Sequence, residues 1–167
     1  RSDCGCSAHS RPGWGQGWRK PLREALDGLR DTLSPLFGEE GASVLPDPYG
    51  ARNRYISVLS GRNGGKVREF LEGEAGRSLS GEELCRSVSL LEMERNLMLM
   101  YTSCGWFFDE LSGIETLQVM AYAARALELG ERLFPARDFR TPFRRKLAEA
   151  QSNIAEFRDG RRIFDIF

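Results

Sequence analysis

The segment 80–101 constrains the fold more than any other part of the chain. It opens with the pattern S-x-x-E, made by Ser80 and Glu83, a capping box in which each side chain satisfies a backbone N–H at a helix start. Residues 97–101 are apolar on every side, which is typical of a helix buried on most of its faces. The sequence therefore predicts a central buried helix, with Gly105 as its stop.

Five further segments place apolar residues at the three- and four-residue spacing of an amphipathic helix. They are residues 21–37, 48–59, 66–74, 113–133 and 141–152. Gly38 is expected to end the first of these helices. A second S-x-x-E pattern, Ser112 with Glu115, is expected to cap the fourth. The side chains of this fourth helix that we expect to face the core are Ile114, Leu117, Ala121, Ala124, Leu127 and Leu129.

Composition supports helix over sheet. The chain has 14 Val, Ile and Thr residues against 20 Leu and 13 Ala, a balance that disfavours strands. Its 167 residues suit one domain. We therefore predict an all-α fold, a single compact bundle of about six helices. Within 1–167 we expect an irregular N-terminal segment at 1–17, a helical core at 18–157 and a docked tail at 158–167, with Cys85 in core packing.

Charge and hydropathy exclude several classes of partner. Lys and Arg together number 24, as do Asp and Glu, so no net field attracts nucleic acid or an anionic membrane. No apolar run approaches the roughly 20 residues that span a bilayer, and the start has no signal peptide. These features favour a cytoplasmic protein with reduced thiols. Because the chain starts without Met, we expect it to be excised from a longer polypeptide.

Two thiols and the single histidine form one candidate site near the start of the chain. Cys4, Cys6 and His9 have donor atoms that zinc accepts, but a structural site needs a fourth ligand. Without that ligand we favour small thiols in a glycine-rich turn, and we expect neither a metal nor a cofactor. A small metal-binding domain built on these residues remains the weaker alternative. One histidine also leaves no partner for a nucleophilic triad.

The loop at 104–110 is the stronger candidate for function. Trp106 and two phenylalanines directly precede Asp109 and Glu110, between two predicted helices. Loops held by rigid elements commonly carry function, and aromatic faces stack on the apolar faces of sugars while carboxylates accept hydroxyl hydrogen bonds. Alternatively, the aromatic side chains close the end of the bundle, and the carboxylates cap helices or face water.

Several motifs together resemble a known family. They are Asp-Cys-Gly-Cys at 3–6, Pro-Leu-Arg-Glu-Ala-Leu-Asp at 21–27, the long stretch Leu-Met-Tyr-Thr-Ser-Cys-Gly-Trp-Phe-Phe-Asp-Glu-Leu-Ser-Gly-Ile-Glu-Thr at 99–116, Tyr-Ala-Ala-Arg-Ala at 122–126 and Leu-Ala-Glu-Ala-Gln-Ser-Asn-Ile at 147–154. The chain thereby resembles the helical domain-of-unknown-function family 3536. That domain follows the catalytic part of proteins similar to glycoside hydrolase family 57.

The resemblance implies a parent protein that acts on α-glucans by retaining chemistry with two carboxylates. Those carboxylates belong to an upstream (β/α) barrel, which is the implied partner of this chain. By resemblance, Trp106, Asp109 and Glu110 contact the substrate, with one face of the Trp106 ring exposed and Asp109 pointing into the same groove. Three thiols, Cys4, Cys6 and Cys104, are candidates to line the cleft, and no catalytic residue is expected here. The alternative is a helical scaffolding or interaction module without substrate contact.

Overall fold

The computed structural model describes residues 11–59 and 64–167. Within them, all regular secondary structure is helical, which confirms the predicted all-α class. The elements are α1 (Arg19–Gly41), α2 (Pro48–Arg54), α3 (Ile56–Leu59), α4 (Gly64–Ala75), α5 (Gly81–Leu99), the 3-10 helix η1 (Ser103–Trp106), α6 (Ile114–Leu133), α7 (Arg140–Leu147) and α8 (Gly160–Ile166).

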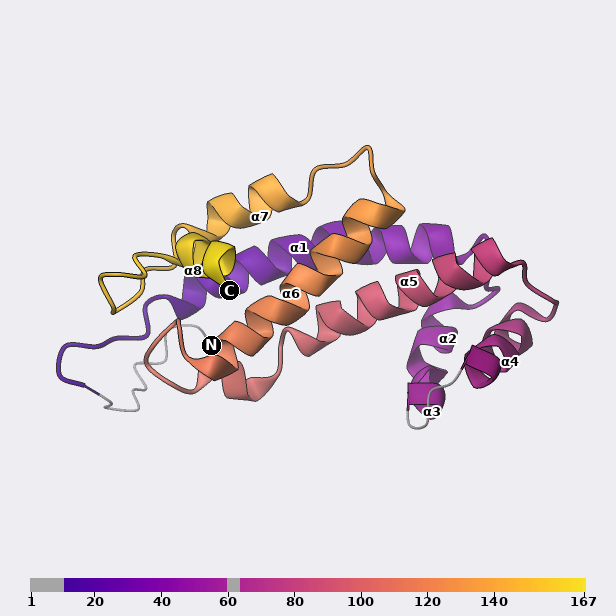
Figure 1. Ribbon diagram of the computed structural model, residues 1–167, viewed down its shortest axis with the longest axis horizontal. Coiled ribbons are helices and arrows are strands. Elements are labelled where there is room, and N and C mark those ends of the chain that lie inside the picture. Colours follow the sequence, from indigo (N-terminus) through magenta and orange to yellow (C-terminus); the bar gives the residue numbers. More distant parts are fainter. Residues whose placement is uncertain (1–10, 60–63) are drawn as a thin grey trace.

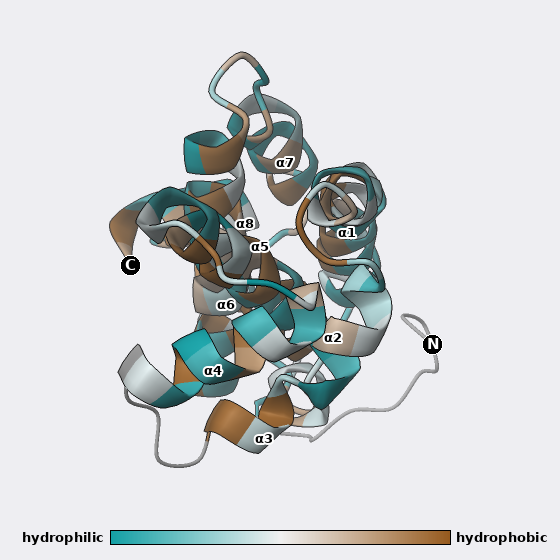
Figure 2. Cartoon of the chain, turned by 90° about the vertical axis from the view of Figure 1, so that its right-hand side faces the viewer, coloured by the Kyte–Doolittle hydropathy of each residue, from teal (hydrophilic) through white to brown (hydrophobic). Residues whose placement is uncertain are grey.

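Three long helices form the body of the molecule (Figure 1). Helices α5 and α6 pack along each other, and α1 packs on both of them. Helix α7 lies on α1, and α8 lies on α7. The short helices α2, α3 and α4 gather at one end, where Figure 2 shows them in front of the long helices. The loop between η1 and α6 lies at the opposite end.

Helix α1 supplies the predicted leucine stripe and extends beyond its predicted end. Its stripe is buried throughout, at Leu22, Leu26, Leu29, Leu33 and Phe37. Gly38 does not stop the helix, which continues to Gly41. A Cβ at Gly38 would lie 2.8 Å from the hydroxyl oxygen of Tyr49. Gly38 therefore lies inside the helix with the end of the Tyr49 side chain against it, and it does not end the helix.

Helix α5 confirms the predicted capping box. The Ser80 hydroxyl accepts from the Glu83 N–H at 3.1 Å, and the Glu83 carboxylate accepts from the Ser80 N–H at 2.9 Å. The helix ends at Leu99, before Gly105. A Cβ on Gly105 would lie 2.3 Å from Cγ2 of Val119. Gly105 thus lies where η1 and α6 approach closely, and it is not the helix stop that the sequence predicted.

Helix α6 buries a face that overlaps the predicted one only in part, since Leu127 and Leu129 are buried as predicted and the other four predicted residues are not. Its buried residues are Thr116, Val119, Met120, Ala123, Ala126, Leu127, Leu129, Gly130 and Leu133. Ile114 is 77% exposed, Ala121 is exposed, and Leu117 and Ala124 are half-buried. The predicted cap is also wrong, because Gly113 is the N-cap and Ser112 donates elsewhere. Both α1 and α5 pack on α6, and together they set which side is covered.

Smaller differences concern the connections and the surface. The predicted helix over 48–59 is divided into α2 and α3, and α7 ends at Leu147, five residues early. Cys85 is exposed, so its assignment to core packing is wrong. In the C-terminal segment Ile163 is fully buried, whereas Phe167 is 72% exposed.

Candidate functional site

The candidate loop links the end of η1 to the start of α6. Trp106 is half-buried and packs against the hydrophobic core. The guanidinium carbon of Arg23, on α1, lies 5.7 Å from the centre of the Trp106 ring and 4.5 Å from that of Tyr101. These spacings are those of cation–π contacts. The indole N–H of Trp106 is buried and has no hydrogen-bond partner among the residues that the structure describes.

The two phenylalanines are the exposed part of the loop. Phe107 is 65% exposed and Phe108 is 42% exposed. Their ring centres lie 5.1 Å apart with the rings at 89°, an edge-to-face pair. Burial normally stabilises phenylalanine, so this pair is an apolar surface that residues 11–59 and 64–167 leave uncovered.

Asp109 directly follows these rings in the sequence, and it is buried inside the protein. Its residue is 1% exposed, so the prediction that Asp109 faces an open groove is wrong for this chain. The side-chain amide of Gln16 donates to Asp109 Oδ1 at 2.7 Å. The Asp109 carbonyl accepts from the indole N–H of Trp18 at 2.8 Å and from the amide of Asn153 at 2.7 Å. The N-terminal segment and the 152–153 turn thus cover this residue.

Glu110 is also buried, at 7% exposure. Its Oε1 accepts from the Ser112 N–H, from the Ser112 hydroxyl and from the Ser152 hydroxyl, at 3.0, 3.1 and 2.6 Å. Its Oε2 accepts from the Asn153 N–H at 2.9 Å. A carboxylate with donors at both oxygens acts as a clamp between segments. Glu110 therefore joins the start of α6 to the turn that follows α7.

Arg19 completes the support of the loop from α1. This residue is 7% exposed, and its Nη2 donates to the Phe107 carbonyl at 2.8 Å. The Gln16 amide donates to the same carbonyl at 3.2 Å. We name the set Gln16, Trp18, Arg19, Asp109, Glu110, Ser152 and Asn153 the loop support. It fixes the loop backbone while leaving the Phe107 and Phe108 side chains in solvent.

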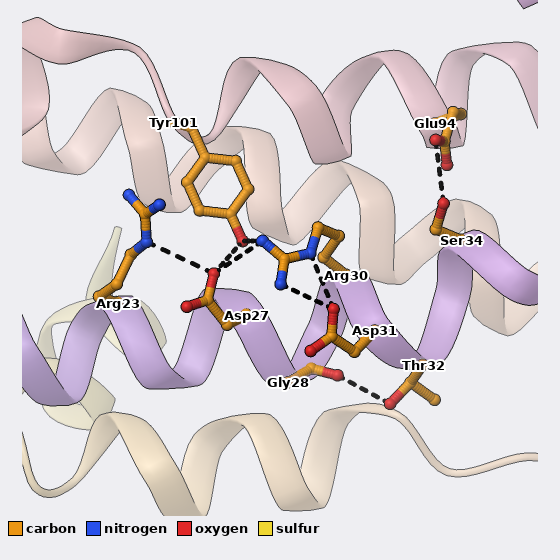
Figure 3. A network of polar contacts seen from close by, with 9 residues as sticks. All are labelled: Arg23, Asp27, Gly28, Arg30, Asp31, Thr32, Ser34, Glu94 and Tyr101. Carbon is orange, nitrogen blue, oxygen red and sulfur yellow. Dashed lines mark hydrogen bonds and ion pairs between the residues drawn. The ribbon is translucent and has the colours of Figure 1, made fainter.

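A polar network continues from the loop along α1 (Figure 3). The Tyr101 hydroxyl donates to Asp27 Oδ1 at 2.7 Å and accepts from Arg30 Nη1 at 3.2 Å. Arg23 pairs with the same Asp27 oxygen at 3.4 Å. Burial raises the pKa of the Tyr101 phenol, and its hydrogen bond to Asp27 raises that pKa further. Tyr101 therefore remains a protonated hydrogen-bond donor at neutral pH and is not a base.

The other candidate site residues from the sequence are the cysteines and the single histidine. Cys104 is a free, exposed thiol in η1. Cys4, Cys6 and His9 lie outside the described residues. Within the described ranges, no group of three or more His, Cys, Asp or Glu side chains is arranged to hold a metal ion. None of the helices in the same ranges combines the length and apolar character that a bilayer crossing needs.

Sequence reasoning missed the residues that support the loop. Gln16 and Asn153 reach Asp109 across 93 and 44 positions of sequence, and no local pattern relates residues so far apart. The only signal was indirect, because residues 152–154 belong to a motif that carried the family resemblance.

Comparison with known proteins supports that resemblance. No curated protein and no solved structure matches the chain significantly. Residues 14–167 match the family described as "Domain of unknown function (DUF3536)". The matched region includes the whole candidate loop and all of the loop support. The chain belongs to the DUF3536 family.

Proposed function

We propose that this chain is an accessory helical domain of a glycoside hydrolase family 57-like protein that acts on α-glucans. In this role the 104–110 loop contributes an aromatic surface to the substrate cleft, and the catalytic carboxylates come from a separate barrel. The observation that carries the proposal is the exposed Phe107–Phe108 pair. It lies on a loop whose backbone carbonyls accept hydrogen bonds from two distant segments of the chain, residues 16–19 and Asn153.

The exposure of the two rings and their place on the loop both support the proposal. Two aromatic side chains in solvent forgo the stabilisation that burial would provide, and exposed apolar patches commonly mark sites of interaction. A sugar presents apolar C–H faces to such rings. The half-buried Trp106 lies directly before the pair and extends the same aromatic segment.

The carboxylates in this proposal position the loop. Retaining hydrolysis needs two carboxyl groups that flank the scissile bond. Asp109 and Glu110 are buried and accept hydrogen bonds from within the chain. Their contacts therefore favour a role in holding the aromatic side chains over a direct role at the sugar. Direct contact of Asp109 or Glu110 with substrate stays a prediction.

The alternative function is a scaffolding module that never touches substrate. The burial of both carboxylates favours it, because a loop built to accept sugar hydroxyls would be expected to present them. In that case Phe107 and Phe108 pack against the barrel or another subunit. The two functions predict different effects on the rate of glucan turnover when the rings are removed.

The experiment uses the longer protein that the proposal requires, whose gene must encode a barrel with its two carboxylates upstream. Phe107→Ala and Trp106→Ala are compared with Ile56→Ala, a 68% exposed apolar residue on α3 at the other end of the molecule. Misplacing a substrate by about 1 Å costs on the order of 100-fold in rate. We expect kcat/KM on an α-glucan to fall at least tenfold for the loop variants. The melting temperature is expected to stay unchanged in Phe107→Ala and to fall in Trp106→Ala, whose half-buried ring packs against the core.

Two results would count against the proposal. Unchanged kcat/KM in Phe107→Ala, with loss of association between domain and barrel, would support the scaffold. A gene that encodes no barrel with its two carboxylates would remove the basis for the glucan function and would favour the scaffold.

A further inference from the structure

A groove far from the candidate loop lies between α4, α5 and α6. Its volume is about 550 Å³. The groove lies along the second half of α6, whereas the candidate loop precedes Ile114 at the start of that helix. Arg132 follows Ile114 by 18 residues, or about 27 Å at the helical rise of 1.5 Å per residue. The groove is therefore separate from the surface considered above.

The floor of the groove is aliphatic. It is formed by Val67 of α4, Leu84 and Val88 of α5, and Leu129 of α6. Only Leu129 is fully buried, and the other three are half-buried. The groove is thus an open furrow with apolar side chains at its base, a shape that fits the face of a helix.

The rim of the groove is basic. Arg68, Arg125 and Arg132 line it. Arg68 pairs with Glu72 and also donates to the Leu79 carbonyl at 3.2 Å, and Arg125 pairs with Glu128 in an exposed contact on α6. Such exposed pairs are weak and exchange readily with another carboxylate. Arg132 makes no hydrogen bond or ion pair within the part of the chain that the structure describes.

The one acidic residue in the lining does not neutralise this rim. Glu92 accepts from the Tyr55 hydroxyl at 2.8 Å, and its second oxygen pairs with Arg95 at 3.4 Å. Its charge is therefore engaged by residues outside the groove. The lining thus carries three arginines: Arg68 and Arg125 have carboxylate partners on their own helices, and Arg132 lies close enough to Glu128 to help lower the pKa of that carboxyl.

The spacing of the cations identifies the kind of partner. Arg125 and Arg132 are seven residues apart on α6, so they lie on one face, about 10 Å apart along the axis. Arg68 comes from a different helix. A single anionic head group is met by cations that converge, whereas these are distributed along a furrow. Carboxylates seven residues apart on a second helix have the same spacing as Arg125 and Arg132.

We infer that this groove docks an amphipathic helix of a partner protein. The aliphatic face of that helix lies on Val67, Leu84, Val88 and Leu129. Its flank carries Asp or Glu at a seven-residue interval and pairs with Arg125 and Arg132. The inference is independent of the proposed glucan function, because it uses another surface.

The test is a charge swap with a defined probe. The probe is a fluorescently labelled helical peptide of about four turns, with Leu at i, i+3, i+4 and i+7 and Glu seven residues apart on one flank. A twin peptide carries Lys in place of Glu. Binding to the full chain is followed by fluorescence anisotropy, with wild type, Arg125→Glu/Arg132→Glu and Arg137→Glu as the proteins. Arg137 is exposed and outside the groove lining, so it is the matched control.

We expect the Glu peptide to bind wild type and Arg137→Glu saturably, at least tenfold more tightly than the Lys peptide. The double variant is expected to reverse that preference, and added salt is expected to weaken both charge-matched pairs. A helical spectrum and an unchanged melting temperature verify that the double variant is folded. Val88→Lys, which places a charged chain in the floor, is expected to abolish binding of both peptides.

Three outcomes overturn the inference. They are no saturable binding of the Glu peptide to wild type, equal binding of the two peptides, and undiminished Glu-peptide binding by the double variant. Sedimentation of the chain with phosphatidylserine vesicles, lost in the double variant while the Glu peptide fails to bind, would instead assign the basic rim to an anionic lipid surface.

Discussion

Glu110 shows how much one side chain contributes to the position of the loop. It accepts four hydrogen bonds, and its donors belong to two segments that are 40 or more residues apart in sequence. Removing a buried acceptor leaves those donors unpaired, and each unpaired buried group costs about 1–3 kcal/mol. The Glu110 side chain is therefore expected to stabilise the position of the loop, although a charged residue is usually exposed.

We predict that Glu110→Ala lowers the free energy of unfolding by about 2–4 kcal/mol. Glu110→Gln is expected to cost less, since one amide oxygen still accepts while the new NH₂ group faces donors. Urea denaturation measures both, with the exposed Glu156→Gln as control. A loss below about 0.5 kcal/mol for Glu110→Ala would mean that the clamp does not stabilise the fold.

Glu83 gives the molecule a local pH dependence. The Arg77 guanidinium hydrogen-bonds to this carboxylate and, together with the Ser80 N–H, lowers its pKa from 4.5 to about 2. The folded-state pKa lies below the unfolded value. The contribution of ionised Glu83 to the free energy of unfolding is therefore complete above about pH 4.5 and is lost as the pH falls toward 2. We predict that NMR titration finds the Glu83 pKa near 2 and that Arg77→Ala moves it toward its ordinary value. An unchanged pKa in that variant would assign the shift to the helix start alone.

At the scale of elements, the rotation of α6 decides which apolar residues stabilise the protein. Leu91 of α5 is fully buried, whereas Leu117 of α6 is half-buried and lines a surface groove of about 670 Å³ beside α8. Both leucines lie on helices that pack together, and helical spacing alone makes them look equivalent.

We predict that Leu91→Ala costs about 2–5 kcal/mol, because it leaves a cavity in the core. Leu117→Ala is expected to cost less than half as much, since solvent already reaches that side chain. Thermal and chemical denaturation of the two variants provide the comparison. Equal losses would place the buried face of α6 where the sequence predicted it, at Leu117, and not where the structure has it.

At the scale of the whole molecule, stability is concentrated in α1, α5 and α6. These helices contribute most of the fully buried leucines, whereas α2 buries only Ala51 and α3 only Val58. A buried carboxylate, Glu94 of α5, connects the two parts by accepting from Ser34 at 3.0 Å and from Arg52 at 2.9 Å. The short helices are thus attached to a stable three-helix body.

We predict that amide hydrogen exchange is slowest in α1, α5 and α6 and faster in α2, α3 and α4, because local opening is easiest where few apolar contacts are lost. Mass spectrometry of exchanged peptides resolves the two groups. Arg52→Ala is expected to accelerate exchange in α2 specifically. Uniform protection across all helices would show that the molecule opens only as one cooperative unit.

The sequence by itself determined what depends on near neighbours. The capping box at Ser80, the leucine stripe of α1 and the all-α class are set by interactions within about four residues, and each was predictable. Tertiary structure alone decided the roles of Gly38 and Gly105, because a glycine that ends a helix and one that admits a crossing segment look the same in sequence. It also decided the exposed face of α6 and the burial of Asp109 and Glu110. Those outcomes depend on partners such as Gln16 and Asn153, which reach the loop from 93 and 44 positions away and which no local pattern identifies.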